Sequence, residues 1–192
     1  IKTGIILVGY GAVIYCAVFF LLRCLQRLVN GQKEDIEEVK EAGCGIQVAG
    51  FLFLCWIPWL VILYPGTALY DAGTMLEQYY GYAPLTNHHP YFQILLLGLF
   101  VRIGEILGSG AFGMFLYVLV QEIAFIAVLS YMTGLLKKMG VGRKIRKALV
   151  LLYAFLPVFP VYAFSVGKNI NFSIVFLLLT LFLFQKALQM MN

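Results

Sequence analysis

Long apolar segments constrain this chain more than any other feature of its sequence. A bilayer core about 30 Å thick takes roughly 20 helical residues to cross, and several apolar runs approach or exceed that length. Mean hydropathy is +0.90. Only 12% of the residues are charged, against about 25% in an ordinary soluble domain. The sequence therefore predicts an all-α fold, a polytopic transmembrane helical bundle that fills residues 1–192 as a single membrane domain.

The distribution of positive charge predicts how the chain crosses the membrane. Lys and Arg are enriched in residues 23–45 and again in 137–147, and such loops face the cytoplasm. The two regions would lie on opposite sides if residues 91–107 crossed the membrane as well. We therefore predict that residues 91–107 form a juxtamembrane amphipathic helix on the outer surface, with Arg102 and Glu105 on its wet face.

About five spans follow from this topology. The polar segments 64–111 and 165–171 face outward, while 23–45 and 137–147 face inward. The net charge of +5 comes from clusters at segment ends, so we expect a lipid bilayer and no nucleic acid as partner. Because the chain begins at Ile1 rather than Met, we expect it to be the N-terminal or central part of a longer protein. The predicted spans lie near residues 5–22, 46–63, 112–136, 148–164 and 172–189.

The external loop 64–111 carries most of the residues that could perform chemistry. Its first part, YPGTALYDAGTMLEQYYGYAPLTNHHP, contains both histidines of the chain and no Lys or Arg. Asp71 in this stretch can serve as a general base or can cap the amides of a helix that follows it. Residues alone leave both roles open.

The adjacent histidines His88 and His89 raise the question of a metal ion. Neighbouring side chains point about 100° apart on a helix and to opposite faces on a strand, so we predict no metal site built from both. Ligation of a divalent metal by one of them together with Asp71 is an alternative, and no other cofactor is expected. One imidazole can instead orient or protonate a phosphate, while the other caps a helix that begins near Pro90.

Two further ionisable residues stand out against the apolar background. Lys168, in the second external loop, either contacts a phosphate or extends its ammonium group to the membrane interface. Glu122 lies within a predicted span, where a charge is costly and usually faces a protein interior or a wet cavity. We expect Glu122 to pair with a helix outside this sequence or to line a polar cavity.

The order of these features resembles the membrane glycosyltransferases of the GT-C class, such as the protein O-mannosyltransferases and the aminoarabinose transferases of lipid A. In that class an acidic residue in the first external loop precedes a His-Pro motif that opens a juxtamembrane helix. The matching residues here are Asp71, His89 and Pro90, with 91–107 as the helix.

The YPG, YD and NHHP patterns resemble even more closely a group of uncharacterised bacterial multi-pass proteins, which implies the bacterial cytoplasmic membrane as the location. In that group a Lys-Asp pair often precedes a later span. Here the pair reads Lys168 and Asn169, and an Asn cannot act as a base or a strong metal ligand. The resemblance therefore leaves a second acidic site in doubt.

The resemblance implies an enzyme, a hexosyltransferase that moves a sugar from a polyprenyl-phosphate donor to an acceptor hydroxyl at the outer face of the membrane. Asp71 would be its general base. Other readings are a transporter or flippase of a lipid-linked substrate, for which no broken helix or repeat is visible in the sequence, and a non-catalytic membrane scaffold. The implied substrate-binding residues are His88, His89, Lys168 and Arg102 at the leaving phosphate, and Tyr70 on a sugar ring, although an interfacial tyrosine belt would also explain Tyr70.

Overall fold

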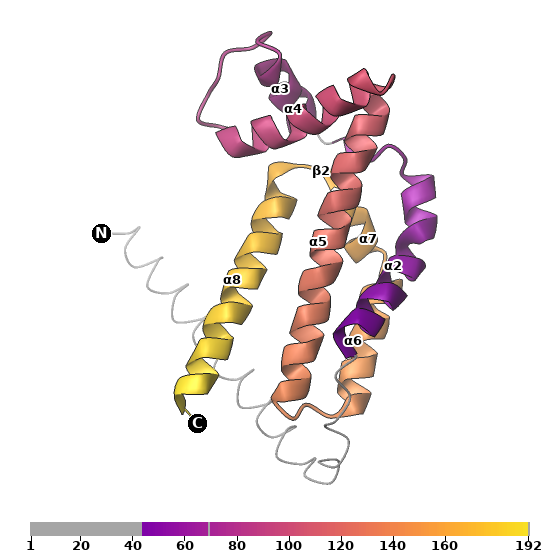
Figure 1. Ribbon diagram of the computed structural model, residues 1–192, viewed down its shortest axis with the longest axis vertical. Helices are drawn as coiled ribbons and strands as arrows, with labels where there is room; N and C mark the ends of the chain where they lie inside the picture. The colour runs from indigo at the N-terminus through magenta and orange to yellow at the C-terminus, as the bar shows by residue number, and fades with distance from the viewer. Residues whose placement is uncertain (1–43, 69, 192) are drawn as a thin grey trace, which may run out of the picture.

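The computed structural model describes residues 44–68 and 70–191, which form seven helices and two short strands. Within this part of the chain, three helices are long and apolar enough to cross a membrane. They are α2 (Cys44–Ile62), α5 (Gly110–Lys138) and α8 (Lys168–Met191), and they run along the long axis of the molecule (Figure 1). These features are those of a helical membrane protein. The predicted first span, 5–22, lies outside the described residues.

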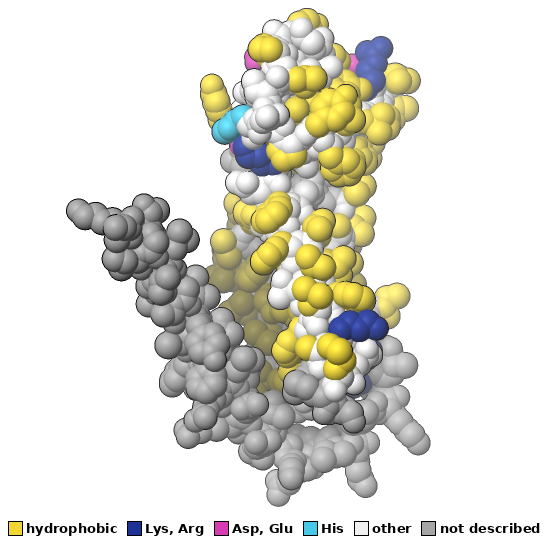
Figure 2. All heavy atoms as spheres, turned by 90° about the vertical axis from the view of Figure 1, so that its left-hand side faces the viewer, with side chains coloured by type: hydrophobic (Ala, Val, Ile, Leu, Met, Phe, Trp, Pro, Cys, Tyr) yellow, Lys and Arg dark blue, Asp and Glu magenta, His cyan; other side chains and the backbone are white. Residues whose placement is uncertain are grey.

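Helix α5 is the central element of the bundle. It contacts α2, α4, α6, α7 and α8, and half of its spanning segment is buried, against 11% in α2 and 17% in α8. A helix that is apolar all round is stable only in such a core or in lipid. Ser109 caps its start by accepting a hydrogen bond from the Phe112 amide at 3.3 Å. Figure 2 shows hydrophobic side chains over much of the bundle's length and charged ones toward its ends.

The segment predicted as one span over 148–164 is instead two helices. Helix α6 (Arg143–Phe155) ends before Leu156 and Pro157, and the short α7 (Val158–Ala163) follows. Pro157 pushes the residue before it out of helical geometry, and Leu156 has φ −77° and ψ 113°. The fourth predicted span is therefore a broken helix, which corrects the sequence-based expectation.

Strand pairing was not expected from the sequence. Strand β1 (Thr67–Ala68) lies parallel to β2 (Ser165–Val166), with Thr67 opposite Ser165. The Thr67 amide donates to the Phe164 carbonyl at 2.9 Å. Only Gly167 separates β2 from α8, which starts four residues before the predicted start at 172. The predicted loop 165–171 is therefore largely a strand and a helix turn.

The YPG sequence makes the turn that leads from α2 into β1. Gly66 has φ 126°, and a Cβ atom there would lie 2.7 Å from Cγ2 of Val118. Both the backbone angle and the lack of space require glycine. The preceding Tyr64–Pro65 peptide bond is cis. This turn therefore lies close to α5 at Val118.

Helices α3 (Tyr70–Tyr79) and α4 (Tyr91–Ile106) lie at one end of the bundle, with α4 directed across α5 (Figure 1). The predicted start of α4 near Pro90 is confirmed, since Pro90 is its N-cap; no side chain caps it, so neither histidine has the predicted capping role. Two glycines allow the crossing, because a Cβ on Gly104 would lie 2.2 Å from the Gly113 nitrogen. The backbones of α4 and α5 are thus in direct contact.

Candidate functional site

The parallel strands bring two distant charged residues together. Asp71 lies in the first turn of α3, just after β1, and Lys168 is the first residue of α8, just after β2. Because Ala68 pairs with Val166, the residues that follow the strands are also neighbours. Lys168 Nζ lies 3.5 Å from Asp71 Oδ2. Asp71 is thus within the first turn of α3, where a carboxylate is favoured by the helix dipole.

Both histidines meet the same ammonium group. Lys168 Nζ donates a hydrogen bond to the His88 carbonyl at 3.0 Å and lies 3.4 Å from Nδ1 of His89. The two imidazoles meet edge to face with centroids 4.6 Å apart. His88 is exposed, whereas His89 is buried at 4% exposure. We call Asp71, His88, His89 and Lys168 the Lys168 cluster.

Burial and charge together favour a neutral His89. Burial lowers its pKa below 6.5, the positive charge of Lys168 lowers it further, and Asp71 only partly opposes this. Since an ammonium group can only donate hydrogen bonds, Nδ1 of His89 must accept. The proton of the neutral ring is therefore on Nε2, which leaves an N–H donor for another group.

The cluster also has a metal-like set of ligand atoms. One ligand atom from each of Asp71, His88 and His89 lies within 4.8 Å of the others, and a carboxylate with imidazoles suits a transition metal. The histidines lie in a turn, so the geometric objection based on helices and strands does not apply. Lys168, however, places its own positive charge against the side chains of Asp71 and His89 and the carbonyl of His88. A divalent ion would have to displace that ammonium group.

A hydrogen-bond network of two amide side chains and a tyrosine hydroxyl links the helices around the Lys168 cluster. Gln93 Nε2 donates to the Tyr117 hydroxyl at 2.5 Å, and Asn171 Nδ2 donates to the same oxygen at 2.8 Å. Asn171 also donates to Gln93 Oε1 at 3.0 Å. The three residues belong to α4, α5 and α8. They fix the start of α4, which follows His89, relative to the start of α8, which carries Lys168.

A second buried amide anchors the strand that precedes Lys168. Gln121 Nε2 donates to the carbonyls of Ala163 at 2.7 Å and Ser165 at 3.0 Å. Its neighbour Glu122 is fully buried, and neither carboxylate oxygen has a hydrogen-bond partner among the described residues. The structure thus gives Gln121 a positioning role, while Glu122 remains outside the Lys168 cluster.

A pocket of about 330 Å³ lies beside His89. A second pocket, of about 350 Å³, is separate from it and lies between α2, α5 and α6. The side-chain amide of Gln78 holds the loop around the pocket beside His89. It donates to the Pro84 carbonyl at 3.0 Å and to Thr86 Oγ1 at 3.2 Å. Asp71 and Lys168 do not line this pocket, so His89 connects it to the cluster. Its lining residues are Leu85, Thr86, Asn87, His89, Pro90, Tyr91 and Ile94.

Two candidate binding residues have no contact with the cluster. Arg102 pairs with Glu105 at 3.0 Å, as their spacing predicts, and Tyr80 donates to the same carboxylate at 2.7 Å. These hydrogen bonds lower the pKa of Glu105. Arg102 lies 12 residues along the chain from Pro90, about 18 Å of helix. Tyr70 starts α3 beside Asp71 but is 92% exposed.

Sequence reasoning missed the residues that support the site. These are Gln93, Tyr117, Gln121 and Asn171, each buried or half-buried between helices. The available signal was the presence of isolated amide side chains within apolar segments, where an unsatisfied polar group is costly. Such residues usually mark a buried hydrogen-bond network.

Comparison with protein families identifies the larger part of this chain. Residues 80–191 match the model of a family of unknown function (DUF6020), and the chain belongs to that family. The match includes His88, His89 and Lys168, while Asp71 precedes it. Comparisons with curated proteins and with solved structures gave no match.

Proposed function

We propose that this protein is a membrane glycosyltransferase that moves a sugar from a polyprenyl-phosphate donor to an acceptor hydroxyl, with Asp71 as general base. The observation that carries the proposal is the position of Lys168. Its ammonium group lies between the Asp71 carboxylate and Nδ1 of His89, at 3.5 and 3.4 Å. A potential base and a potential phosphate-binding cation therefore lie side by side at a bundle end.

The proposed membrane topology has five spans, with the broken α6–α7 pair as the fourth. Helix α4 lies along the outer surface, which agrees with its direction across α5 (Figure 1). Its exposed apolar side chains, such as Phe92, Leu95 and Leu99, would enter the interface. The basic segment 137–147 lies at the other end of α5 and faces the cytoplasm of a bacterium. The Lys168 cluster then opens to the outer face.

The proposed reaction is a displacement at the anomeric carbon of the donor. The acceptor oxygen forms a bond to that carbon while its proton passes to Asp71. The bond from the carbon to the phosphate oxygen breaks, and its electron pair stays on the phosphate. Lys168 and the Nε2 proton of His89 stabilise the developing negative charge. The pocket beside His89 would hold part of the donor or acceptor.

The Lys168–Asp71 ion pair must open during this reaction. In the structure without ligand, Asp71 neutralises a cation at the start of α8, where the helix dipole also disfavours positive charge. A donor phosphate that binds Lys168 would take over this role. Asp71 would then be available to accept the proton of the hydroxyl group. Binding of the sugar donor would thereby free the Asp71 carboxylate to act as the base for the acceptor hydroxyl.

The first test measures sugar transfer by the full-length protein in membranes with labelled polyprenyl-phosphate sugars. Asp71→Asn should reduce transfer by about 10²-fold or more, as expected for loss of a general base. Glu77→Gln is the matched control, because Glu77 is an exposed carboxylate on the same helix. Equal transfer by wild type and Asp71→Asn would refute the role of Asp71.

A second test does not require the correct sugar. Every such donor releases a polyprenyl phosphate, so its binding can be measured directly by native mass spectrometry. Lys168→Gln should weaken binding about tenfold, the effect of losing one charge-assisted phosphate contact. Lys186→Gln, at the far end of the same helix, is the control. Unchanged binding in Lys168→Gln would contradict the proposed phosphate site.

Two observations favour a lipid-linked substrate transporter as the alternative. The α6–α7 break is a feature that transporters use, and Glu122 is buried without a hydrogen-bond partner among the described residues. Transport by such a protein should depend on Glu122, whereas sugar transfer should depend on Asp71. Comparing Glu122→Gln with Asp71→Asn in both assays separates the two functions. A scaffold would be insensitive to either change.

A further inference from the structure

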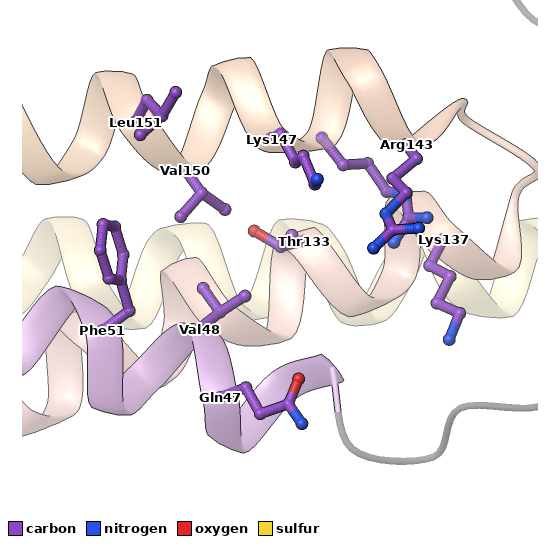
Figure 3. Close-up of a pocket in the computed structure, with 10 residues that line it drawn as sticks. Gln47, Val48, Phe51, Thr133, Lys137, Arg143, Lys147, Val150 and Leu151 are labelled. Atoms are coloured by element: carbon purple, nitrogen blue, oxygen red, sulfur yellow. The ribbon is translucent and has the colours of Figure 1, made fainter.

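A second polar site lies at the opposite end of the bundle from the Lys168 cluster. It is a pocket of about 350 Å³ between α2, α5 and α6, near the turn that joins α5 to α6 (Figure 3). We call it the basic pocket. It is lined by four cationic residues, Lys137, Arg143, Arg146 and Lys147, together with Gln47, Thr133, Val48, Phe51, Val150 and Leu151.

The lining of the basic pocket changes from charged to apolar along the helix axes. On α6 the cations lie in the first turn or so, through Lys147, and Val150 and Leu151 follow one turn deeper. On α2, Gln47 is followed by Phe51 in the same direction. Figure 3 shows this order, with the labelled basic groups at one side and the labelled apolar side chains at the other. The pocket is therefore amphipathic.

Helix α5 contributes two polar residues to the pocket near its C-terminal end. Lys137 is in its last turn, and the buried Thr133 lies one turn deeper. Helices α2 and α6 thus place polar groups at one depth and apolar groups further into the bundle, and α5 adds a cation at the polar depth. This ordering matches the change from headgroup to acyl chain in a lipid leaflet, in which basic pockets between spanning helices bind anionic headgroups.

We infer that the basic pocket binds one anionic phospholipid. The phosphate contacts the Lys and Arg side chains, which bind it by charge-assisted hydrogen bonds, and an acyl chain lies along Phe51, Val150 and Leu151. A soluble phosphate would leave the apolar half of the pocket without a ligand. The volume of about 350 Å³ is that of a small ligand site. The inference does not depend on sugar transfer at the other end.

Titration of the full-length protein in detergent with phosphatidylglycerol, followed by native mass spectrometry, tests this inference. Lys147→Gln should weaken binding about fivefold, since one basic residue contributes about that factor near anionic lipid. Lys144→Gln is the matched control, because Lys144 is exposed on the same helix but does not line the pocket. It should change binding less than about twofold.

The apolar half of the pocket is tested without a change of charge. Val150→Trp fills the space beside Leu151 and should weaken phosphatidylglycerol binding by a similar factor, with thermal unfolding as a check of the fold. Phosphatidylcholine and glycerol phosphate serve as ligands that lack the net charge or the acyl chains. The inference is wrong if wild type binds either of them as tightly as phosphatidylglycerol. Equal weakening by Lys144→Gln and Lys147→Gln would also overturn it, since that indicates attraction to the whole basic surface.

Discussion

The contact between α4 and α5 leads to a sharp prediction for Gly113→Ala. A Cβ atom on Gly113 would lie 2.3 Å from the Phe100 carbonyl oxygen, 2.7 Å from the Val101 Cα and 3.0 Å from the Gly104 Cα. All three neighbours are backbone atoms, so no side-chain rotation can relieve the overlap. Normal contact distances are about 3.5 to 4.0 Å. The two helices must therefore separate by about 1 Å.

This separation should be costly because it is transmitted to the site. Overpacking of a well-packed contact typically costs about 1 to 3 kcal/mol, and a rigid backbone neighbour places Gly113→Ala at the upper end. Movement of α4 also strains the hydrogen bonds from Gln93 to Tyr117 and from Lys168 to the His88 carbonyl. We expect both a lower unfolding temperature and weaker polyprenyl-phosphate binding.

The matched control is Gly134→Ala on the same helix. A Cβ on Gly134 meets nothing within 4 Å, and alanine is favoured over glycine in a helix by about 1 kcal/mol. Gly134→Ala should leave the unfolding temperature in detergent unchanged or raise it, whereas Gly113→Ala should lower it. If both variants unfold at the same temperature as wild type, α4 does not cross α5 in the way described.

Three further predictions follow from individual contacts. Folding lowers the pKa of His89, so below about pH 6.5 the unfolded chain binds more protons than the folded chain. Thermal stability should therefore fall as the pH is lowered below about 6.5, and His89→Gln should reduce this pH dependence. Tyr117→Phe leaves Gln93 Nε2 without its acceptor and should cost about 1 to 3 kcal/mol in denaturant unfolding, a loss that an unchanged midpoint would rule out. Trp56→Phe removes the 3.2 Å hydrogen bond to the Tyr153 carbonyl and should cost roughly 0.5 to 1.5 kcal/mol beyond the packing loss, measured in the same way.

The helices of the bundle could be predicted because their signals are local. Apolar length alone located α2, α5 and most of α8, and Pro90 located the start of α4. The break before α7 could have been anticipated from Pro157, since a proline within an apolar run disfavours a continuous helix. Hydropathy outweighed that signal, because Leu156 and Pro157 are both compatible with a lipid environment. Hydropathy does not locate the start of α8, because its first turn contains the polar residues Lys168, Asn169 and Asn171.

The sequence can nominate residues for the candidate site, but it cannot give their geometry. Asp71, His88, His89 and Lys168 were each selected from the sequence for their chemistry. Their convergence depends on two strands of two residues each, which are too short to show any alternation of side chains. Asp71 and Lys168 are 97 residues apart, so only tertiary structure could show their pairing. Arg102, by contrast, was assigned to the site by its charge, although its local partner Glu105 was already visible three residues away.

The position of Lys168 suggests why the cluster should receive an anion. A cation at the first residue of a helix is opposed by the helix dipole, and the only described carboxylate within ion-pair distance is Asp71 at 3.5 Å. His89 is buried beside it, and its lowered pKa leaves it unable to supply further positive or negative charge at neutral pH. In the proposed function, an anionic group that enters the cluster would gain the Lys168 ammonium group as its partner. With the proposed function, the same arrangement would account for both the ion pair between Lys168 and Asp71 and its opening when a phosphate binds.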